Sequence, residues 1–263
     1  MASSRLRMAL ALTVTLALLA SPPPALAWGK AGHRVVAALA TSLLATETQR
    51  QVADLLDPGL TLADIATWAD EVRPNRPTTG PWHNVYIPRG ASGYNAQRDC
   101  SQGCVVSAIE QSLRLLQDPS KGRAVHQEAL KWVVHFVADL HQPLHAIADD
   151  RNEVLVQLAS RQMNLHRLWD VDLIEQVYPD QTMLQERVLT TLQTENWRTW
   201  QAGRPQDWAE ETHRVAIEAA YLFPLSGEID ERYVEKALPV IHGQLAKAAV
   251  RLAWLLNRAR EQK

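Results

Sequence analysis

Histidine and aspartate recur in this sequence at the spacing that lets a helix bind a metal ion. His135 and Asp139 stand four residues apart in one apolar stretch, and His166 and Asp170 stand four residues apart in another. Side chains at positions i and i+4 share one face of a helix, with Cβ atoms about 5–6 Å apart. Imidazole and carboxylate groups both bind zinc with bonds of about 2 Å, so each pair can hold one ion.

Further donors of the same kind stand nearby in the sequence. His141 and His145 form a third pair at this spacing, although Pro143 interrupts the helix between them. Asp70 and His83 add one carboxylate and one imidazole. A single histidine is a poor indicator of a metal, since most are packed or solvated, and His141 can equally orient a ligand or lie on the surface. The remaining histidines are interpreted as ordinary: His126, His213 and His242.

Residues 1–27 have the layout of a secretory signal peptide. Arg5 and Arg7 give a charged start, an apolar stretch follows, and residues 25–27 (Ala-Leu-Ala) form a cleavage site. The apolar stretch is shorter than the ~20 residues that span a bilayer, so a retained membrane anchor is the weaker interpretation. We therefore expect a mature chain of residues 28–263 that is secreted or periplasmic, with no membrane attachment.

Removal of the leader would also create a metal donor. Trp28 would become the first residue, and its free amine can bind zinc together with His33, which follows five residues later. Two metal ions about 3.5–4 Å apart need a bridging group and several terminal ligands. Asp139 is the best bridging candidate, because it lies in the middle of the ligand-rich helix.

The charge balance and the cysteine count restrict the possible functions. The formal net charge is −2, and loss of the leader removes two arginines and no acid, which changes it to −4. A duplex DNA binder usually has a basic face, so nucleic-acid binding here would depend on bound cations and stacking. Cys100 and Cys104 favour a disulfide outside the cytoplasm, since a zinc knuckle would need a second cysteine pair.

The apolar pattern predicts one all-α domain with at most a small β element. Apolar residues recur at helical spacing through most of the mature chain, and Pro143 should end or kink the helix that carries His135 and Asp139. The expected helices are residues 35–44, 105–116, 124–140, 165–177, 184–192, 207–223 and 233–256, and the expected extended pieces are residues 83–88 and 154–158.

Several sequence blocks, in order across the mature chain, resemble one protein family. They are WGKAGH at 28–33, ATWADEVR at 66–73, WH at 82–83, CVVSAI at 104–109, HFVADLHQPLH at 135–145, NLHRLWD at 164–170, WAEE at 208–211 and VRLAWLLN at 250–257. Together they resemble the secreted zinc-dependent single-strand-specific nucleases with 3′-nucleotidase activity (type I nucleases). These are distant relatives of zinc-dependent phospholipase C. The resemblance runs from Trp28 to about Asn257.

The resemblance implies an all-helical fold in which nine residues hold three zinc ions. All nine positions carry the expected residue types in this sequence. Grouped by ion, they are Asp70, His83 and His135 for the first; Asp139, as a bridge to the second; Trp28, through its amine and carbonyl oxygen, and His33 for the second; and His145, His166 and Asp170 for the third.

The resemblance also places substrate-binding residues beside the metals. The family has an Arg or Lys three residues after the aspartate of WAD, close to the scissile phosphate, and Arg73 fills that position. An Asn after the ligand-rich helix helps to hold the phosphate, and Asn152 is the nearest match. The family usually has two glycines directly before this Asn, whereas residues 149–151 here are Asp-Asp-Arg.

A second departure follows His83, where the family has an aromatic residue, any residue, and then Asn or Asp. Here the aromatic residue and the amide exchange places, as Asn84 and Tyr86. Both would point to the same side of an extended segment. We therefore expect a substrate base to stack on Tyr86, with an altered base preference.

The chemistry predicted for these residues is phosphodiester hydrolysis. Zinc can lower the pKa of a bound water to near 7, so no dedicated general base is needed, and Asp70 can help to orient that water. Arg73 would donate charge-assisted hydrogen bonds to the phosphate. The resemblance implies single-stranded DNA, RNA and 3′-nucleotides as substrates, with 5′-phosphate products and no stable protein partner.

Three alternatives compete with a nuclease. A zinc-dependent phospholipase C would use a related cluster, but the WGKAGH and ATWADEVR blocks are nuclease-like. A catalytically impaired secreted zinc-binding homologue is compatible with the departures at Asn84, Tyr86 and Asn152. A cytosolic His-Asp phosphohydrolase would not need the leader at residues 1–27.

Overall fold

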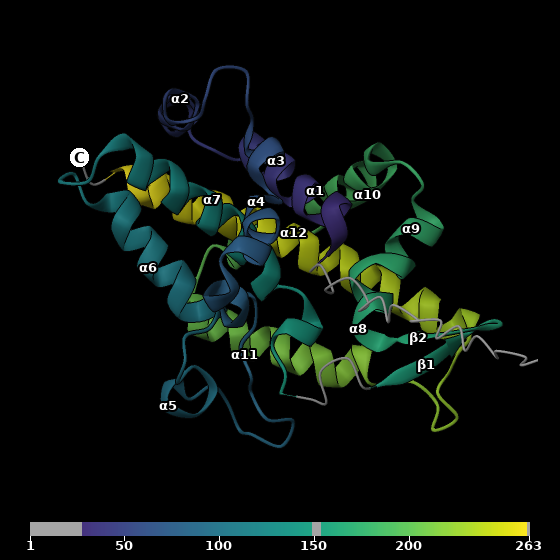
Figure 1. Ribbon diagram of the computed structural model, residues 1–263. Coiled ribbons are helices and arrows are strands. Elements are labelled where there is room, and N and C mark those ends of the chain that lie inside the picture. Colours follow the sequence, from purple (N-terminus) through teal and green to yellow (C-terminus); the bar gives the residue numbers. More distant parts are fainter. Residues whose placement is uncertain (1–27, 149–153, 262–263) are drawn as a thin grey trace, which may run out of the picture.

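The computed structural model describes residues 28–148 and 154–261 of the chain. The body of the fold is built from the helices α1 (Gly29–Ser42), α6 (Val105–Gln117), α7 (Arg123–Leu140) and α12 (Glu231–Glu261). Helix α12 runs through the length of the molecule, and the other three pack against it (Figure 1). Since α7 also contacts α1 and α6, it lies at the centre of the bundle.

Helix α7 carries the ligand-rich segment and is surrounded by protein along its second half. Every residue from Trp132 to Leu140 is buried, as expected for a helix that is largely apolar on all sides. The helix ends at Leu140, as predicted, because the proline that opens the 3₁₀ turn η3 (Pro143–His145) has no amide donor. The Gln142 side chain caps η3 by accepting a hydrogen bond from the Leu144 amide.

Shorter elements connect the long helices and cover the ends of the bundle. The helices are α2 (Thr46–Leu55), α3 (Leu62–Ile65), α4 (Trp68–Val72), α5 (Ala96–Asp99), α8 (Leu165–Arg167), α9 (Leu173–Val177), α10 (Gln181–Thr194) and α11 (Pro205–Val215). The 3₁₀ turns are η1 (Arg73–Asn75), η2 (Pro77–His83) and η5 (Trp197–Trp200), and the π-helical turns are η4 (Leu168–Asp172) and η6 (Ala216–Ala220).

A three-stranded sheet lies beside the helical body. Its strands, in the order β2-β1-β3, are β2 (Arg161–Asn164), β1 (Leu155–Leu158) and β3 (Glu228–Ile229). The pair β1–β2 is an antiparallel hairpin, and β3 runs parallel to β1. Asn164 ends the hairpin, and its side chain accepts a hydrogen bond of 3.1 Å from the Arg167 amide. This N-cap fixes the start of the helix that carries His166.

The predicted fold class is confirmed, because the fold is mainly helical with one small sheet. The helices expected at 35–44, 105–116, 124–140, 184–192 and 233–256 coincide with α1, α6, α7, α10 and α12. Two expected helices differ from the structure. The one at 165–177 is interrupted by the π-helical turn η4, and the one at 207–223 already ends at Ala220, in η6.

The segment 83–88, expected to be extended, has extended backbone angles at Asn84 but forms no regular strand. His83 ends the 3₁₀ turn η2, and Pro88 forms an isolated bridge with Ala148. The segment bonds to separate elements instead of one neighbouring strand. The Val85 amide donates to the His145 carbonyl at 2.8 Å, and the Asn84 carbonyl accepts from the first amide of α6 at 3.0 Å. The segment therefore connects η3 to α6.

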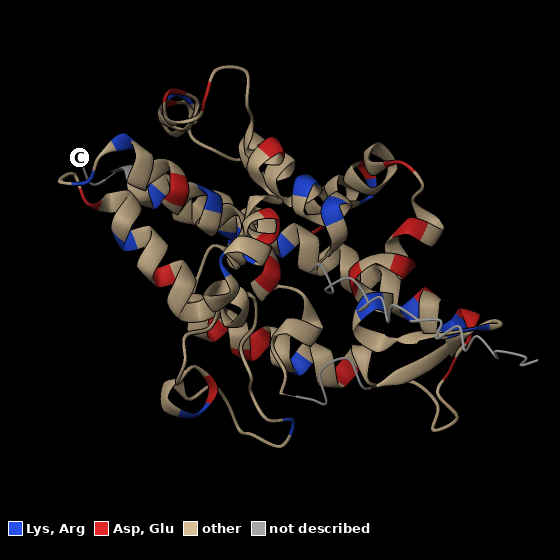
Figure 2. Ribbon diagram, in the orientation of Figure 1, with Lys and Arg blue, Asp and Glu red and all other residues tan. Residues whose placement is uncertain are grey.

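Charged residues of both signs are mixed along the chain. In the view of Figure 2, basic and acidic residues are scattered over the molecule and do not gather by sign in one region. This distribution agrees with the composition, which gave no reason to expect a basic face. Among the residues that the structure describes, no helix is long and apolar enough to cross a bilayer.

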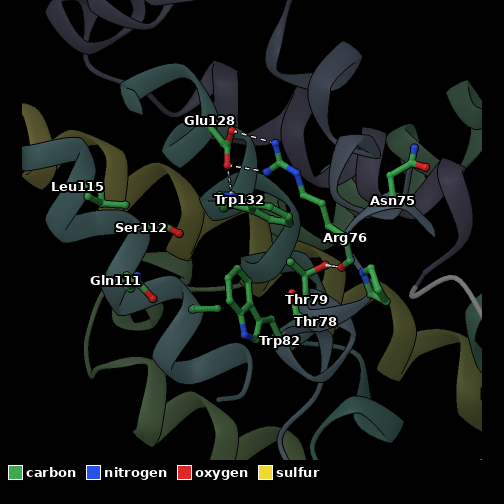
Figure 3. Close-up of a pocket in the computed structure, with 12 residues that line it drawn as sticks. Asn75, Arg76, Thr78, Thr79, Trp82, Gln111, Ser112, Leu115, Glu128 and Trp132 are labelled. Carbon is green, nitrogen blue, oxygen red and sulfur yellow. Dashed lines mark hydrogen bonds and ion pairs between the residues drawn. The ribbon is translucent and has the colours of Figure 1, made fainter. Parts of the chain in front are cut away.

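A pocket with a volume of about 470 Å³ opens between α6, α7 and the segment that forms η1 and η2 (Figure 3). Its walls combine indole rings, small hydroxyl and amide side chains, and one ion pair. The lining residues are Asn75, Arg76, Pro77, Thr78, Thr79, Trp82, Ala108, Gln111, Ser112, Leu115, Glu128 and Trp132.

Candidate metal centre

The fold brings the predicted His and Asp ligands together in compact groups. In each group, one donor atom of every residue lies within 4.8 Å of the others. The eight predicted His and Asp ligands all belong to these groups, although they come from α1, α4, η2, α7, η3, α8 and η4. Among the described residues, the groups are His33, His135 and Asp139; Asp70, His83 and His135; and His145, His166 and Asp170.

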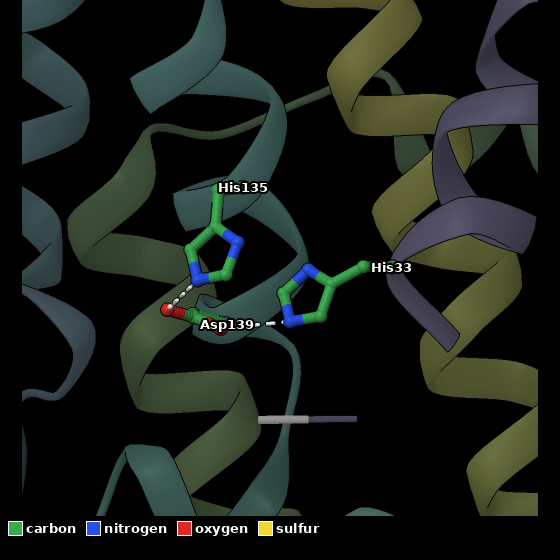
Figure 4. Close-up of side chains that lie close together, drawn as sticks. All are labelled: His33, His135 and Asp139. Carbon is green, nitrogen blue, oxygen red and sulfur yellow. Dashed lines mark ion pairs between the residues drawn. The ribbon is translucent and has the colours of Figure 1, made fainter. Parts of the chain in front are cut away.

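Asp139 lies between the first two groups. One carboxylate oxygen, Oδ2, is 2.9 Å from His83 Nδ1 and 3.2 Å from His135 Nε2. The other oxygen, Oδ1, is 3.4 Å from His33 Nε2 (Figure 4). The two oxygens thus face different sets of imidazoles, which is the arrangement that a carboxylate needs in order to bridge two ions. The i, i+4 spacing places His135 and Asp139 on one face of α7, as predicted.

Backbone carbonyls orient two of the imidazoles. His135 Nδ1 lies 2.8 Å from the Ala66 carbonyl, and His145 Nδ1 lies 2.7 Å from the His83 carbonyl. A carbonyl can only accept, so each Nδ1 carries the proton and Nε2 is the nitrogen that can bind a metal. Nε2 of His145 has no hydrogen-bond partner, and Nε2 of His135 lies 3.2 Å from Asp139 Oδ2. The bond from His145 to the His83 carbonyl also ties the third group to the second.

Buried donor atoms without a protein partner test whether the site suits metal ions. Buried polar atoms are nearly always hydrogen-bonded, so each exception calls for an explanation. Seven of the ten such atoms among the described residues belong to the three groups, and a cation among them would satisfy these lone pairs. Within the described residues, they include His33 Nδ1 and Nε2, His83 Nε2, Asp139 Oδ1, His145 Nε2, His166 Nε2 and Asp170 Oδ2.

The third group depends on Gln142, which the sequence alone did not indicate. Gln142 is fully buried, and its Nε2 donates a hydrogen bond to Asp170 Oδ1. The other oxygen, Oδ2, remains 3.3 Å from His166 Nε2. Asp170 itself lies in the π-helical turn η4, a feature that is frequent at functional sites. The one available signal was an amide between two histidines in the segment HQPLH.

The main chain of Trp28 lies beside this centre. The indole is fully buried, and its Nε1 donates to the Ala138 carbonyl at 2.9 Å, next to Asp139. The Trp28 amide donates a hydrogen bond to the Asp170 carboxylate. Gly32 is required for this packing, because a Cβ at that position would be 2.6 Å from the Trp28 Cβ.

Burial and mutual charge shift the pKa values of these groups in opposite directions. Burial raises the pKa of Asp170 well above its ordinary value, and it lowers the pKa of His145 to about 4. Burial also disfavours the charged forms of His135 and Asp139. The electrostatic attraction between the two side chains outweighs this effect of burial, so the pKa of His135 rises to about 9 and the pKa of Asp139 falls well below its usual range. A metal ion between them would take the place of the shared proton.

Comparison with known proteins agrees with this site. The sequence profile described as S1/P1 Nuclease matches residues 28–261, which is nearly the whole described chain. The chain belongs to the S1/P1 nuclease family. Relatives include Endonuclease 2 of Arabidopsis thaliana, 30% identical over 93% of this chain and 94% of the relative. Endonuclease 4 of the same plant is 32% identical over 89% of each chain. Nuclease S1 of Aspergillus oryzae is 30% identical over 93% of this chain and 96% of the relative.

Membership of the S1/P1 nuclease family identifies the chain as a nuclease, a hydrolase whose substrates are nucleic acids. The predicted resemblance is confirmed at the level of the family. The His and Asp groups could hold metal ions in this nuclease. The identity and number of the ions, the individual ligands and the reaction products stay predictions.

The predicted phosphate-binding residue Arg73 lies beside the third group. It begins η1, and its Nε would be 3.9 Å from a Cβ placed on Gly80, so the side chain lies against η2. The pKa of His166 is lowered well below its ordinary value, first by burial and next by the neighbouring His145. The positive charge of Arg73 contributes to the same shift. Arg73 is therefore near enough to this group for its charge to act there.

The other predicted substrate residues are only partly described. Asn84 and Tyr86 are half-buried, whereas Val85 and Ile87 between and after them are fully buried. The alternation agrees with the expectation that residues 84 and 86 point to the same side. Asn152 lies outside the described residues.

The predicted disulfide is present between Cys100 and Cys104, and the zinc knuckle is therefore excluded. The loop that it closes supports the metal centre indirectly. Gly103 has a φ of 84°, and a Cβ there would be 3.1 Å from Trp82 Nε1. The loop thus packs against the indole that directly precedes His83.

His141 proves to be buried, so the surface interpretation of this residue is wrong. Its Nδ1 lies 2.7 Å from the Val137 carbonyl, and its Nε2 lies 2.9 Å from Arg251 Nη1 on α12. Gln244, also on α12, donates to the His141 carbonyl at 3.0 Å. His141 therefore ties the end of α7 to α12 and contacts none of the predicted ligands through these bonds.

Proposed function

We propose that this nuclease is a three-zinc phosphodiesterase that cleaves single-stranded DNA and RNA to 5′-phosphate products and also hydrolyses 3′-nucleotides. The observation that carries the proposal is the contiguity of three buried His/Asp groups whose unpartnered donor atoms face one another. Imidazole and carboxylate donors in sets of three to four are typical of zinc sites. Hydrolysis of a phosphodiester mainly needs positive charge and an aligned water.

The proposed ligand sets follow the three groups. One ion is bound by Asp70, His83, His135 and Asp139; a second by Asp139, His33 and the amine and carbonyl of Trp28; and a third by His145, His166 and Asp170. The contacts described above support these sets. Asp139 has one oxygen toward each of the first two groups, and the Trp28 indole donates to the carbonyl of Ala138, the residue before Asp139.

The protein residues around the metals position the substrate and direct protons. Bound zinc supplies a water that is acidic near neutral pH and positive charge for the phosphate. Asp70, whose side chain is still slightly exposed, would help to hold one ion and would orient the water that this ion supplies toward the phosphorus. Arg73 donates charge-assisted hydrogen bonds to the phosphate oxygens as negative charge builds up. The phosphate thus lies between a cationic side chain and the metal groups.

Export completes the centre in this proposal. Residues 1–27, which lie outside the described residues, are removed as a signal peptide, and the protein acts in the periplasm or outside the cell. The support is the location of Trp28, whose buried indole donates to the Ala138 carbonyl and whose main-chain amide donates to the Asp170 carboxylate. An amine released at this position would lie beside one of the proposed ligands.

Selectivity for single strands follows from the depth of the site. All the His and Asp ligands other than Asp70 and His166 are buried. A phosphate in a rigid, stacked duplex therefore cannot reach them unless the strand unpairs. An unpaired base can stack on an aromatic side chain, which contributes about 1–3 kcal/mol. Tyr86, half-buried and three residues after His83, is the proposed stacking residue for the base at the cleaved bond.

One set of assays tests the proposed function against its alternatives. The mature protein should hydrolyse single-stranded DNA, RNA and 3′-AMP, duplex DNA much more slowly, and phosphatidylcholine not at all. Asp139→Asn should abolish hydrolysis together with zinc binding. His126→Gln serves as the matched control, because His126 bonds to the Asp118 carbonyl and belongs to none of the groups. Turnover of phosphatidylcholine, or zinc binding without turnover of any nucleic acid, would contradict the proposal.

A further inference from the structure

The pocket between α6, α7 and the η1–η2 segment is separate from the metal ligands. None of the residues that line it belongs to the three His/Asp groups. Its volume of about 470 Å³ lies within the range typical of small-molecule sites. The pocket is therefore large enough to admit one flat heterocycle and needs an explanation that the metal centre does not give.

Two indole rings form an aromatic corner in this pocket. Trp82 and Trp132 meet edge to face, with ring centroids 5.7 Å apart and planes at 72° (Figure 3). Both rings are fixed by their surroundings. The Trp132 Nε1 donates to Glu128 at 3.3 Å, and Gly103 of the disulfide loop packs against the edge of Trp82. The corner is thus preformed, so a ligand would lose little entropy in ordering it.

The rim of the pocket has polar groups but little net charge. Arg76 and Glu128 form an ion pair of 2.7 Å on one side, and their side chains are 44% and 43% exposed. Gln111, Ser112 and Thr78 add amide and hydroxyl groups on the other sides. This lining suits an uncharged ring with donors and acceptors on its edge, and it does not suit a phosphate.

The pocket adjoins the metal centre through shared elements. Trp82 directly precedes His83, and Trp132 precedes His135 by three residues, which is about 4.5 Å along the axis of α7. Trp132 stacks on Phe136 with centroids 5.1 Å apart, and Phe136 contacts the His83 ring at 5.2 Å. Arg73, the proposed phosphate ligand, begins the same segment that ends at His83.

We propose that this pocket is a second base-binding subsite, which holds an unpaired base of the nucleic-acid strand near the nucleotide that is cleaved. The proposal rests on the nuclease function proposed above. The base stacks on Trp82, and its edge bonds to the amide and hydroxyl groups of the rim. A paired base cannot enter without unstacking, so the subsite adds to the selectivity for single strands. It binds the base, while the phosphates stay outside with Arg73 and the metals.

Two variants of the full mature protein test this subsite by different means. Trp82→Leu removes the stacking ring, and Ala108→Leu, on α6, adds volume to the pocket wall while keeping both indoles. The KM for a single-stranded decanucleotide should rise about 5- to 150-fold relative to the KM for a 3′-mononucleotide, because stacking contributes about 1–3 kcal/mol per base. Trp197→Leu is the matched control, since this indole in η5 is half-buried like Trp82 but does not line the pocket; it should leave both KM values unchanged.

The result that overturns the subsite is an unchanged ratio of the two KM values in both variants. Equal rises for both substrates in both variants would also overturn it, since they would indicate damage to the shared centre. Binding of a non-cleavable phosphorothioate decanucleotide to the zinc-loaded protein gives an independent readout. If the unaltered protein cleaves no nucleic acid, the proposed function fails, and this binding measurement still decides the subsite. Weaker binding in both variants supports it, and binding equal to that of the unaltered protein contradicts it.

Discussion

Replacing Gln142 by Leu should loosen the third metal site while preserving every predicted ligand. The buried Gln142 side chain makes two hydrogen bonds, from its Nε2 to Asp170 Oδ1 and from the Leu144 amide to its Oε1. Leucine has a similar volume but can make neither bond. The substitution therefore leaves a carboxylate oxygen and an amide buried without these partners.

The size of the effect follows from these two groups. Each buried polar group that loses its partner destabilises the fold by about 1–3 kcal/mol, so about 2–6 kcal/mol is expected in total. For a chain of this length, that lowers the melting temperature by on the order of 10 °C. A ligand that loses its orienting hydrogen bond usually binds its metal about 10- to 100-fold more weakly. We expect the loss of zinc to be confined to the site of His145, His166 and Asp170.

Competition with a chromophoric zinc chelator measures the affinity, and calorimetry measures the melting temperature. Gln244→Leu is the matched control, because it removes another buried amide that bonds to the His141 carbonyl, away from the ligands. It should lower the melting temperature but not the zinc affinity. If Gln142→Leu kept its zinc as tightly as the unaltered protein, or if both variants lost zinc equally, the positioning role of Gln142 would be refuted.

Three further predictions concern other parts of the site and the core. Arg73→Gln should lower kcat/KM for single-stranded DNA by roughly 10- to 100-fold at unchanged zinc content, since it removes a charge-assisted phosphate contact; an unaltered kcat/KM would refute the role of Arg73. Gly32→Ala should displace Trp28, because the new Cβ would be 2.6 Å from the Trp28 Cβ, and zinc analysis should find about one ion fewer; Gly243→Ala, with nothing within 4 Å of its Cβ, is the control. Burial, aided by Arg187, lowers the pKa of His242 to about 4, below the unfolded value of about 6.5. The unfolded chain therefore takes up this proton first, and the stability that depends on neutral His242 is complete above pH 6.5 and is lost as the pH falls toward 4. Urea titrations of His242→Gln should show a weaker pH dependence over this window than the unaltered protein, and identical slopes would contradict the argument.

The sequence predicted best what depends on local periodicity. The pair His135/Asp139 lies on one face of α7 because a spacing of four residues fixes the direction of both side chains within a helix. The pair His166/Asp170 also comes together, with its nearest donor atoms 3.3 Å apart, although it spans α8 and η4. The end of α7 near Pro143 was predictable for a similar reason, since proline lacks the amide donor that a helix interior needs. The π-helical turn η4, which carries Asp170, was not predictable, because such a turn depends on how the segment packs against the rest of the fold.

Contacts between distant segments could not be derived from spacing. Asp70 and His83 join His135 only because α4 and η2 pack against α7, and in the sequence analysis this grouping came from the family resemblance. The role of Gln142 depends on a partner 28 residues away. Trp82 and Trp132 are separated by fifty positions, so the pocket between them is visible only in the fold.

The most direct test counts zinc ions in two forms of the mature protein by mass spectrometry of metals. One form begins at Trp28, and the other carries a single extra glycine before it. The account predicts three tightly bound ions per molecule in the first form, and it predicts fewer ions and lost nuclease activity in the second. Two or fewer ions in the form that begins at Trp28, or equal zinc content and activity in both forms, would contradict a centre completed by the Trp28 amine.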